Sequence, residues 1–341
     1  IVFGDWSSDV CSSDLVKEYI GTGPYKFVEW IPDRHIRLAR FEDYSALPGG
    51  ANGYGGTKYA WADEILFIPV SDRMTRVSGM MAGDFDYSTI PADQINQVKT
   101  NPNVQVSSVS IGEMPCMVFN LKQGNLTDVR LRQAILAALN MNDIMGAAFS
   151  DPLFYDLHPS WMPRGNSWWN SAGSEVYNKP DIARAQRLMK EAGYNGQEIV
   201  WVTTSTYDYM YHNAMVAVSQ LEKAGFKINL QVVDWATLGQ LRVKPEAYDI
   251  FSSGLTRKVD PTMIAFMGTG WPGWYDTPRK NELVAKLKSE FDPQKRIQLW
   301  AEMSKVIYEE LPAVTFGEMK SAVAYRKSVK DLDLGPCPFF W

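Results

Sequence analysis

An α/β fold is predicted, because one local pattern occurs twice in succession in the second half of the chain. Each copy is a helix that ends in Ala-Gly plus an aromatic residue and continues into an apolar strand. The glycine supplies the left-handed cap, and the ring after it packs back onto the helix. The predicted pairs are a helix over 181–192 with a strand over 198–203, and a helix over 214–224 with a strand over 227–233.

The elements before these pairs are also predicted from periodicity and from turn residues. Residues 26–30 and 35–40 alternate around the Pro32-Asp33 turn and predict a strand hairpin. Asp128 is a suitable N-cap for a helix, because its carboxylate accepts the first free backbone N–H groups. The other predicted elements of this part are strands over 62–70, 104–109 and 115–121 and a helix over 72–82.

The elements after the pairs lead to a loop that is a candidate binding site. Residues 248–253 are aromatic and apolar and predict a buried strand that ends at Gly254. Arg257 and Lys258 follow, where a strand end opens into a loop, and α/β proteins bind small molecules at such places. A solvated surface turn is the alternative. The remaining predictions are helices over 235–242, 279–291 and 293–311 and strands over 313–316 and 321–325.

Composition limits the classes of function. The chain has 341 residues, of which 45% are hydrophobic, so it can bury more than one core. The net charge of −5, without a basic run, argues against nucleic acid as a partner. No apolar run approaches the roughly 20 residues that cross a membrane. Twelve tryptophans and sixteen tyrosines suit the walls of a pocket for polar organic molecules, although many such rings simply fill cores.

Residues 1–15 differ from the rest of the chain. They contain a near-tandem Ser-Ser-Asp-Val and Ser-Ser-Asp-Leu around Cys11 and show no helical or strand periodicity. We therefore expect this segment to be foreign to the native gene and exclude it from the fold prediction.

Several stretches, taken in order, resemble one family. They are Gly-Thr-Gly-Pro-Tyr-Lys-Phe over 21–27, Phe119-Asn120 followed by 128–135, residues 183–193 and 221–225, Tyr-Asp-Ile-Phe over 248–251, and Asp292-Pro293 with Arg296. The chain resembles the bacterial extracellular solute-binding proteins of family 5, the peptide and nickel receptors that feed ABC importers. No one motif is specific, and the order and spacing over 20–330 carry the resemblance.

The resemblance implies an α/β periplasmic binding protein, type II and cluster C-like, with two lobes that close on a ligand about a two-strand hinge. Lobe I would comprise 16–113 plus 313–341, and lobe II would comprise 114–312. The hinge crossings would lie near 113–119 and 311–316. Because the family's chains have a substantial segment before the Gly-Thr-Gly-Pro turn, including the export signal, we expect an N-terminally truncated chain with an incomplete lobe I.

The resemblance also implies a function. The protein would be a monomer in the periplasm or outside the cell, associated with the membrane through ABC transporter permease subunits. It would bind a peptide or peptide-like solute, without a cofactor, and no chemistry on the ligand would be needed. An opine-like conjugate, an oligosaccharide and a chelated metal remain open as ligands.

The chain departs from the family pattern in the loop after 248–253. Peptide-binding members commonly carry a tryptophan after the glycine, then an aspartate that pairs with the peptide ammonium. Here Leu255 replaces the tryptophan, Arg257 or Lys258 falls near the aspartate position, and Asp260 is displaced. Because like charges repel in a desolvated cleft, we expect Lys258 to favour a carboxylate, a phosphate or a sugar hydroxyl.

The candidate ligand-binding residues are mostly aromatic and lie after predicted strands or in loops. Each aromatic ring has core packing as its alternative interpretation. The set is Asn120, Trp161, Trp168, Tyr207, Trp235, Lys258, Asp260, Trp271 and Trp274.

No pattern predicts a catalytic or metal site. His35, His158 and His212 lack metal-ligand spacing, and Cys11, Cys116 and Cys337 are too scattered for a cluster or a disulfide framework. There is no Gly-x-Ser-x-Gly nucleophile turn. We predict no enzymatic activity, and a glycosidase is the alternative, because aromatic and carboxylate side chains also line sugar clefts.

Overall fold

The computed structural model describes residues 19–52, 55–256, 258–334 and 338–341. The chain divides into two compact units, unit 1 with Ile1–Ser78 and Ser328–Trp341, and unit 2 with Gly79–Lys327. The predicted foreign segment over 1–15 lies outside the described residues. The unit boundaries differ from the predicted lobes, because 79–113 and 313–327 pack within unit 2. The division into lobes I and II therefore stays a prediction.

Unit 1 contains the predicted hairpin. The strands β1 (Tyr25–Ile31) and β2 (His35–Arg40) pair antiparallel, and β5 (Glu64–Phe67) completes a three-stranded sheet in the order β1-β2-β5. The Tyr25 hydroxyl donates to the Phe340 carbonyl at 3.0 Å, so β1 contacts the segment 338–341 in this unit. The short strands are β3 (Ala51–Asn52), β4 (Gly55–Gly56), β14 (Asp333–Leu334) and β15 (Pro338–Phe339), and α1 (Arg73–Ala82) crosses the unit boundary.

Unit 2 is built on an eight-stranded mixed sheet with the order β10-β9-β11-β7-β13-β6. Off this path, β12 pairs with β7 and β8 pairs with β13. The strands are β6 (Tyr87–Thr89), β7 (Val104–Phe119), β8 (Tyr155–Asp156), β9 (Glu198–Thr204), β10 (Lys227–Val233), β11 (Ile250–Leu255), β12 (Ala313–Thr315) and β13 (Glu318–Arg326).

The two predicted helix–strand pairs are confirmed. The helix α5 (Ile182–Glu191) leads into β9, and α6 (Asp208–Ala224) leads into β10. Gly193 and Gly225 have φ of 73° and 108°, the left-handed conformation that the Ala-Gly pattern predicts. The helix α6 begins earlier than the predicted residue 214. The other helices of unit 2 are α2 (Ile95–Val98), α3 (Val129–Ala138), α4 (Met141–Phe149), α7 (Trp235–Leu241), α8 (Pro278–Ser289) and α9 (Pro293–Glu310).

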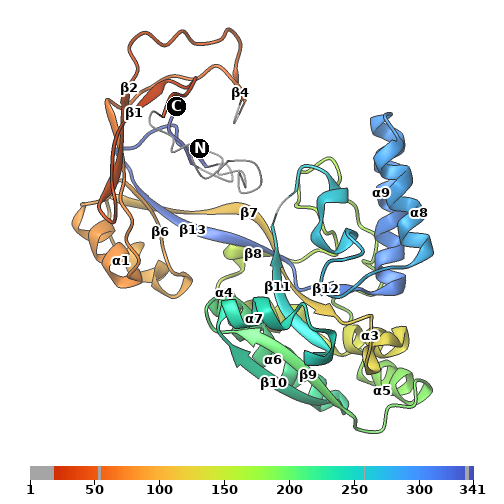
Figure 1. Cartoon of the computed structure of the whole chain (residues 1–341). Helices are drawn as coiled ribbons and strands as arrows, with labels where there is room; N and C mark the ends of the chain where they lie inside the picture. Colours follow the sequence, from red (N-terminus) through yellow and green to blue (C-terminus); the bar gives the residue numbers. More distant parts are fainter. Residues whose placement is uncertain (1–18, 53–54, 257, 335–337) are drawn as a thin grey trace. The chain divides into compact units, whose positions relative to one another are not determined.

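One strand of unit 2 differs from its prediction. Two extended runs were expected over 104–109 and 115–121, but β7 is continuous from Val104 to Phe119. Its register against β13 shifts, because Met319 pairs with Glu113 whereas Lys320 pairs with Ser110. Residues 111 and 112 of β7 therefore have no partner on β13, which makes a bulge, and Gly112 adopts a φ of 65° there. Figure 1 shows β7 and β13 running side by side.

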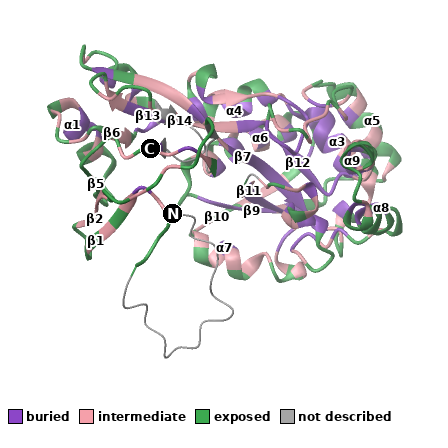
Figure 2. Cartoon of the chain, turned by 90° about the horizontal axis from the view of Figure 1, so that it is seen from above, coloured by how far each residue is buried: buried purple, intermediate pink, exposed green. Residues whose placement is uncertain are grey.

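Helices cover both faces of the parallel part of the sheet. Alternate β7 residues Met114, Cys116 and Val118 join Phe251 in a core with residues of α7, α8 and α9. A second helical layer consists of α6, which packs on β9 and β10, and α4, which packs on α6. Figure 2 shows β7, β9 and β11 largely buried between these layers.

A buried arginine connects α3 to the end of α9. Arg132 is 5% exposed and its guanidinium donates to the carbonyls of Leu126, Thr127, Glu310 and Leu311. Burial lowers the pKa of this guanidinium to about 10. Leu311 has φ of 46°, and these bonds satisfy the carbonyls that the end of α9 leaves free.

Replacing Arg132 should therefore destabilise unit 2. We expect Arg132→Met to lower the free energy of unfolding by about 2–4 kcal/mol, because four backbone carbonyls, two of them buried, lose their donor. Chemical denaturation would measure this change. Arg130→Met is the matched control, since Arg130 lies two residues away but is solvent-exposed, and it should leave the unfolding midpoint nearly unchanged. Equal midpoints for the two variants would contradict this role of Arg132.

Candidate functional site

Three parallel strands of unit 2 end at the same edge of the sheet. β9 is parallel to β10 and to β11, with Thr204 opposite Val233 and Val202 opposite Phe251. We call the edge where β9, β10 and β11 end the carboxyl edge. Ligands of open α/β sheets bind outside the carboxyl ends of parallel strands. The loops that leave this edge are therefore candidates for a binding site.

The loops after β9 and β10 are tied together at the carboxyl edge. The Trp235 N–H donates to the Thr206 Oγ1 atom at 3.1 Å. This bond places the Tyr207 and Trp235 rings edge to face, with centroids 5.1 Å apart and planes at 88°. Tyr207 is 42% exposed, and Trp235 is half-buried against the core. Two of the predicted ligand-binding rings thus meet. The Arg242 guanidinium lies over the Trp235 ring, 5.7 Å from its centroid, so Tyr207 is the more exposed ring of the pair.

A carboxylate lies beside these rings. Glu113 of β7 is half-buried, and its Oε1 atom accepts a hydrogen bond from the Tyr209 hydroxyl at 2.5 Å. Burial raises the pKa of Tyr209 well above its ordinary value, so the phenol stays protonated and donates. Gly254 of β11 faces both groups, and a Cβ at that position would overlap the Glu113 carboxylate and the Tyr209 hydroxyl.

The loop after β11 is braced by an ion pair. Asp260 Oδ2 lies 2.5 Å from Arg296 Nη2, and the Arg296 guanidinium also stacks over the Trp168 ring at 5.1 Å. The Trp168 Nε1–H donates to the Val259 carbonyl at 3.1 Å. Burial would raise the pKa of Asp260, but hydrogen bonds from Thr262 and Arg296 outweigh it and lower the pKa. Trp168 and Asp260 therefore hold the loop in place.

Two cations were predicted in this loop, and Lys258 is the one that the structure describes. It is half-buried, and within the described residues no carboxylate oxygen lies within 4.0 Å of its ammonium. Arg257, the other predicted cation, lies outside the described residues. Because Asp260 pairs with Arg296, the Lys258 ammonium can contact a partner from outside the described chain.

Two further predicted residues, Trp161 and Asn120, are buried. Trp161 is 5% exposed and packs against Phe266 within the core, with the two ring centroids 4.8 Å apart. Asn120 is fully buried, and its Nδ2 donates to the carbonyls of Pro245 and Tyr248 at 2.7 and 2.9 Å. Such a side chain supports the main chain and has no surface for a ligand.

Trp271 and Trp274 lie toward the start of β11, opposite the carboxyl edge. The ring centroids of Trp271 and Phe251 are 5.6 Å apart, and the Trp274 ring stacks on the Tyr248 ring with centroids 6.2 Å apart. The length of β11 separates Asn120 and Trp274 from the carboxyl edge by about 17 Å. The structure thus does not gather the predicted residues into one cluster.

A second carboxylate is buried close to the β7 bulge. Glu318 of β13 is 2% exposed, and it accepts hydrogen bonds from Ser110, from His158 Nε2 at 3.1 Å and from the Arg164 N–H at 3.2 Å. Burial would raise the pKa of Glu318, but these hydrogen bonds outweigh it and hold the pKa below 4.5. This network connects β13, β7 and the loop after β8, and the Glu318 and His158 side chains within it are buried.

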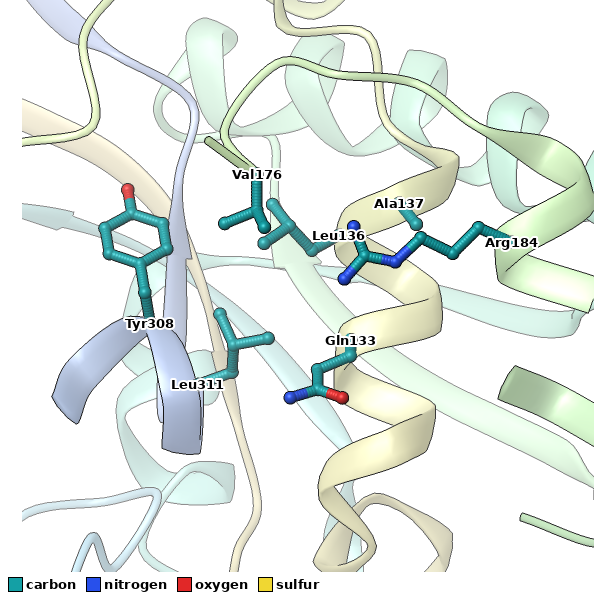
Figure 3. A pocket seen from close by; sticks show the side chains of 7 residues that line it. All are labelled: Gln133, Leu136, Ala137, Val176, Arg184, Tyr308 and Leu311. Atoms are coloured by element: carbon teal, nitrogen blue, oxygen red, sulfur yellow. The ribbon is translucent and has the colours of Figure 1, made fainter. Parts of the chain in front are cut away.

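Figure 3 shows a pocket elsewhere in unit 2, among α3, α5 and the end of α9. Its volume of about 50 Å³ is lined by Gln133, Leu136, Ala137, Val176, Arg184, Tyr308 and Leu311. A space of this size suits a few waters rather than an organic solute. In the part of the chain that the structure describes, no group of His, Cys, Asp or Glu is arranged to hold a metal ion.

Residues 6–270 match the family described as bacterial extracellular solute-binding proteins, family 5 Middle. The chain belongs to this family. The probable peptide ABC transporter periplasmic-binding protein y4tO of Sinorhizobium fredii is 26% identical over 348 residues, covering 96% of this chain and 65% of that protein. The oligopeptide-binding protein AppA of Bacillus subtilis is 24% identical over 337 residues, covering 87% and 56%.

Solved structures of family 5 proteins have the same fold. The substrate-binding protein CtaP of Listeria monocytogenes has a TM-score of 0.78 at 21% identity, covering 90% of this chain and 62% of that one. DppA of Helicobacter pylori, solved with the peptide STSA, has a TM-score of 0.71 at 22% identity, covering 92% and 60%. The predicted family and the α/β periplasmic binding protein fold are confirmed. The chain spans less than two thirds of the length of these relatives.

Glu113 and Tyr209 were not among the predicted site residues of this family 5 chain. Glu113 was predicted only as the start of a hinge crossing, and Tyr209 precedes the predicted start of its helix at residue 214. A signal for Tyr209 was present, because Tyr207, Tyr209 and Tyr211 alternate directly after a strand. No sequence signal brings Glu113 to Tyr209, since 96 positions separate them.

The Glu318 network predicts a specific pH dependence. Since the folded-state pKa of Glu318 lies below 4.5, its contribution to stability is present above pH 4.5 and is lost as pH falls through the folded-state pKa. Glu318→Gln should cost roughly 1–3 kcal/mol at pH 7 and flatten the loss of stability in acid. Denaturation from pH 7 to pH 3 would measure both effects, with exposed Glu175→Gln as the control. An acid profile parallel to that of the wild type would contradict this role.

Proposed function

We propose that this protein is the substrate-binding component of an ABC importer, and that it binds a peptide or peptide-like solute at the carboxyl edge. The observation that carries this proposal is the aromatic surface of Tyr207 and Trp235 beside Glu113, at the end of parallel strands. The relatives named above as peptide-binding and oligopeptide-binding support peptides as the ligand class.

The chemistry of the edge suits a zwitterionic chain. Aromatic faces bind the apolar and peptide parts of such a ligand, and Lys258 provides a cation for a carboxylate. Asp260 does not compete for the ligand's charges, because Arg296 already neutralises it. No step of bond cleavage is required, and the family match gives the alternative of a glycosidase no support.

In the proposed mechanism, binding free energy stabilises a closed arrangement of two lobes that a membrane permease recognises. The hinge would use β7 near 113–119 and the segment 311–316. These segments pair in the structure, with Val118 opposite Ala313 and Cys116 opposite Thr315. We propose a periplasmic or extracellular location and a monomeric state. Within the described residues, no helix has the length and apolar character needed to cross a membrane.

Stoichiometric binding tests the proposal directly. We expect the purified protein to retain tripeptides from a mixed library at one ligand per chain, detected by native mass spectrometry, and to leave them intact. Slow hydrolysis of an oligosaccharide, without retention of any peptide, would contradict the importer role and favour the glycosidase.

Lys258 supplies a sharper test of the anionic end of the ligand. Lys258→Ala should weaken binding of a tripeptide with a free carboxylate by roughly threefold to tenfold, as measured by calorimetry, because a half-buried ion pair is lost. The same tripeptide with an amidated carboxyl terminus should bind the wild type and Lys258→Ala with equal affinity. Lys223→Ala, at the far end of α6, removes the same charge on an exposed surface and should have no effect. Unchanged affinity in Lys258→Ala would contradict the assigned role.

A further inference from the structure

A long segment without regular secondary structure crosses unit 2. Between β8 and α5, residues 157–181 are all described, and they form no helix or strand. Six consecutive residues of this segment, 158–163, are buried. Loops of more than about 12–15 residues without secondary structure are uncommon in compact domains, and those that are ordered are usually functional. We call residues 157–177 the bridging segment.

Both ends of the bridging segment are fixed to the proposed hinge. The Tyr177 hydroxyl donates a buried hydrogen bond to the Phe316 carbonyl at 2.8 Å. At the other end, His158 Nε2 is hydrogen-bonded to the Glu318 carboxylate at 3.1 Å. Phe316 is the last residue of the proposed hinge crossing 311–316, and Glu318 is the first residue of β13. The bridging segment therefore contacts the chain where the hinge crossing enters β13.

Close contacts leave the bridging segment little room to move alone. Gly317 has φ of 147°, and a Cβ there would lie 2.8 Å from the carbonyl oxygen of Asp156, next to the start of the segment. A Cβ on Gly173 would overlap the Tyr308 ring. The Tyr308 hydroxyl also donates to the Pro159 carbonyl at 2.7 Å. Because close-packed groups transmit strain, a shift of the segment would displace its neighbours as well.

The middle of the bridging segment reaches the loop after β11. The Trp168 Nε1–H donates to the Val259 carbonyl at 3.1 Å, and the Arg296 guanidinium lies over the Trp168 ring, 5.1 Å from its centroid. Arg296 also pairs with Asp260 at 2.5 Å. The two loop residues that are held in this way, Val259 and Asp260, come directly after Lys258, the proposed cation of the site.

We propose that the bridging segment transmits ligand binding from the loop after β11 to the hinge, and that Trp168 is the positioning residue at the loop. This inference rests on the proposed function. When an anionic group binds Lys258, the loop is held in one position, and Trp168 and Tyr177 pass that position on to Phe316. Binding free energy thereby stabilises one arrangement of the hinge crossing. Trp168 acts through the backbone of the loop and needs no contact with the ligand.

Hydrogen–deuterium exchange reports on the site and on the hinge in one experiment. A tripeptide library, added at concentrations that saturate each protein by calorimetry, should slow amide exchange of the wild type in 251–256 and in 313–318 by roughly threefold or more. Trp168→Phe removes the N–H group that bonds to Val259. We expect this variant to keep the slowing in 251–256 and to lose it in 313–318.

Trp169→Phe is the matched control for this variant. Trp169 has the same side chain one position later, but its buried Nε1 atom has no hydrogen-bond partner within the described residues. The same substitution at this position removes no hydrogen bond, so Trp169→Phe should keep the slowing in both segments.

A second variant breaks the connection at the hinge. Tyr177→Phe removes the hydroxyl that donates to Phe316, and it should likewise keep the slowing in 251–256 and lose it in 313–318. If one of the two variants does not fold, the other decides. A wild-type response of the hinge in the folded variant overturns the inference.

The outcomes separate this inference from the proposed function. Wild-type protein whose exchange slows in 251–256 but not in 313–318 overturns the role of the bridging segment and leaves ligand binding intact. Loss of the slowing in both segments of Trp168→Phe would place Trp168 in the ligand site itself and would also overturn that role. Wild-type protein in which neither segment responds to the library contradicts the proposed function.

Discussion

The structure of unit 2 depends on the backbone hydrogen bonds of β7. One half of this strand pairs with β11 and β12, and the other half pairs with β13. The change of partner falls at Glu113, next to the bulge at Gly112. Because a bulge re-aims the side chains beside it, the strand that organises the sheet also directs Glu113 toward Tyr209.

The charges at the carboxyl edge fall into two classes. Asp260 is paired with the Arg296 guanidinium, and Glu318 is hydrogen-bonded to His158. These contacts fix the loop after β11 and the region of the bulge. Glu113 and Lys258 have no such described partners, although both are half-buried. Paired charges inside a fold contribute to its architecture, whereas unpaired charges beside exposed rings retain the capacity to bind a ligand.

The sequence predicted local features of this chain better than it predicted the site. Helix caps at Gly193 and Gly225 and the strands after them depend on near neighbours, and they were confirmed. The single strand β7 was missed, because a bulge interrupts the alternation of its residues. The separation of Asn120 and Trp274 from Tyr207 depends on strand direction and register, which no local pattern encodes. The Glu113–Tyr209 contact depends on three adjacent strands and was likewise beyond prediction.

Hydrogen–deuterium exchange with and without a saturating tripeptide library tests the central claim, that solute binds at the carboxyl edge of unit 2. The account predicts slower amide exchange on ligand addition in 111–116, 204–210, 233–237 and 251–256, the segments that meet at this edge. Protection confined to the opposite end of β11, in 119–124 and 271–275, would contradict it. So would protection confined to the small pocket around Gln133 and Arg184.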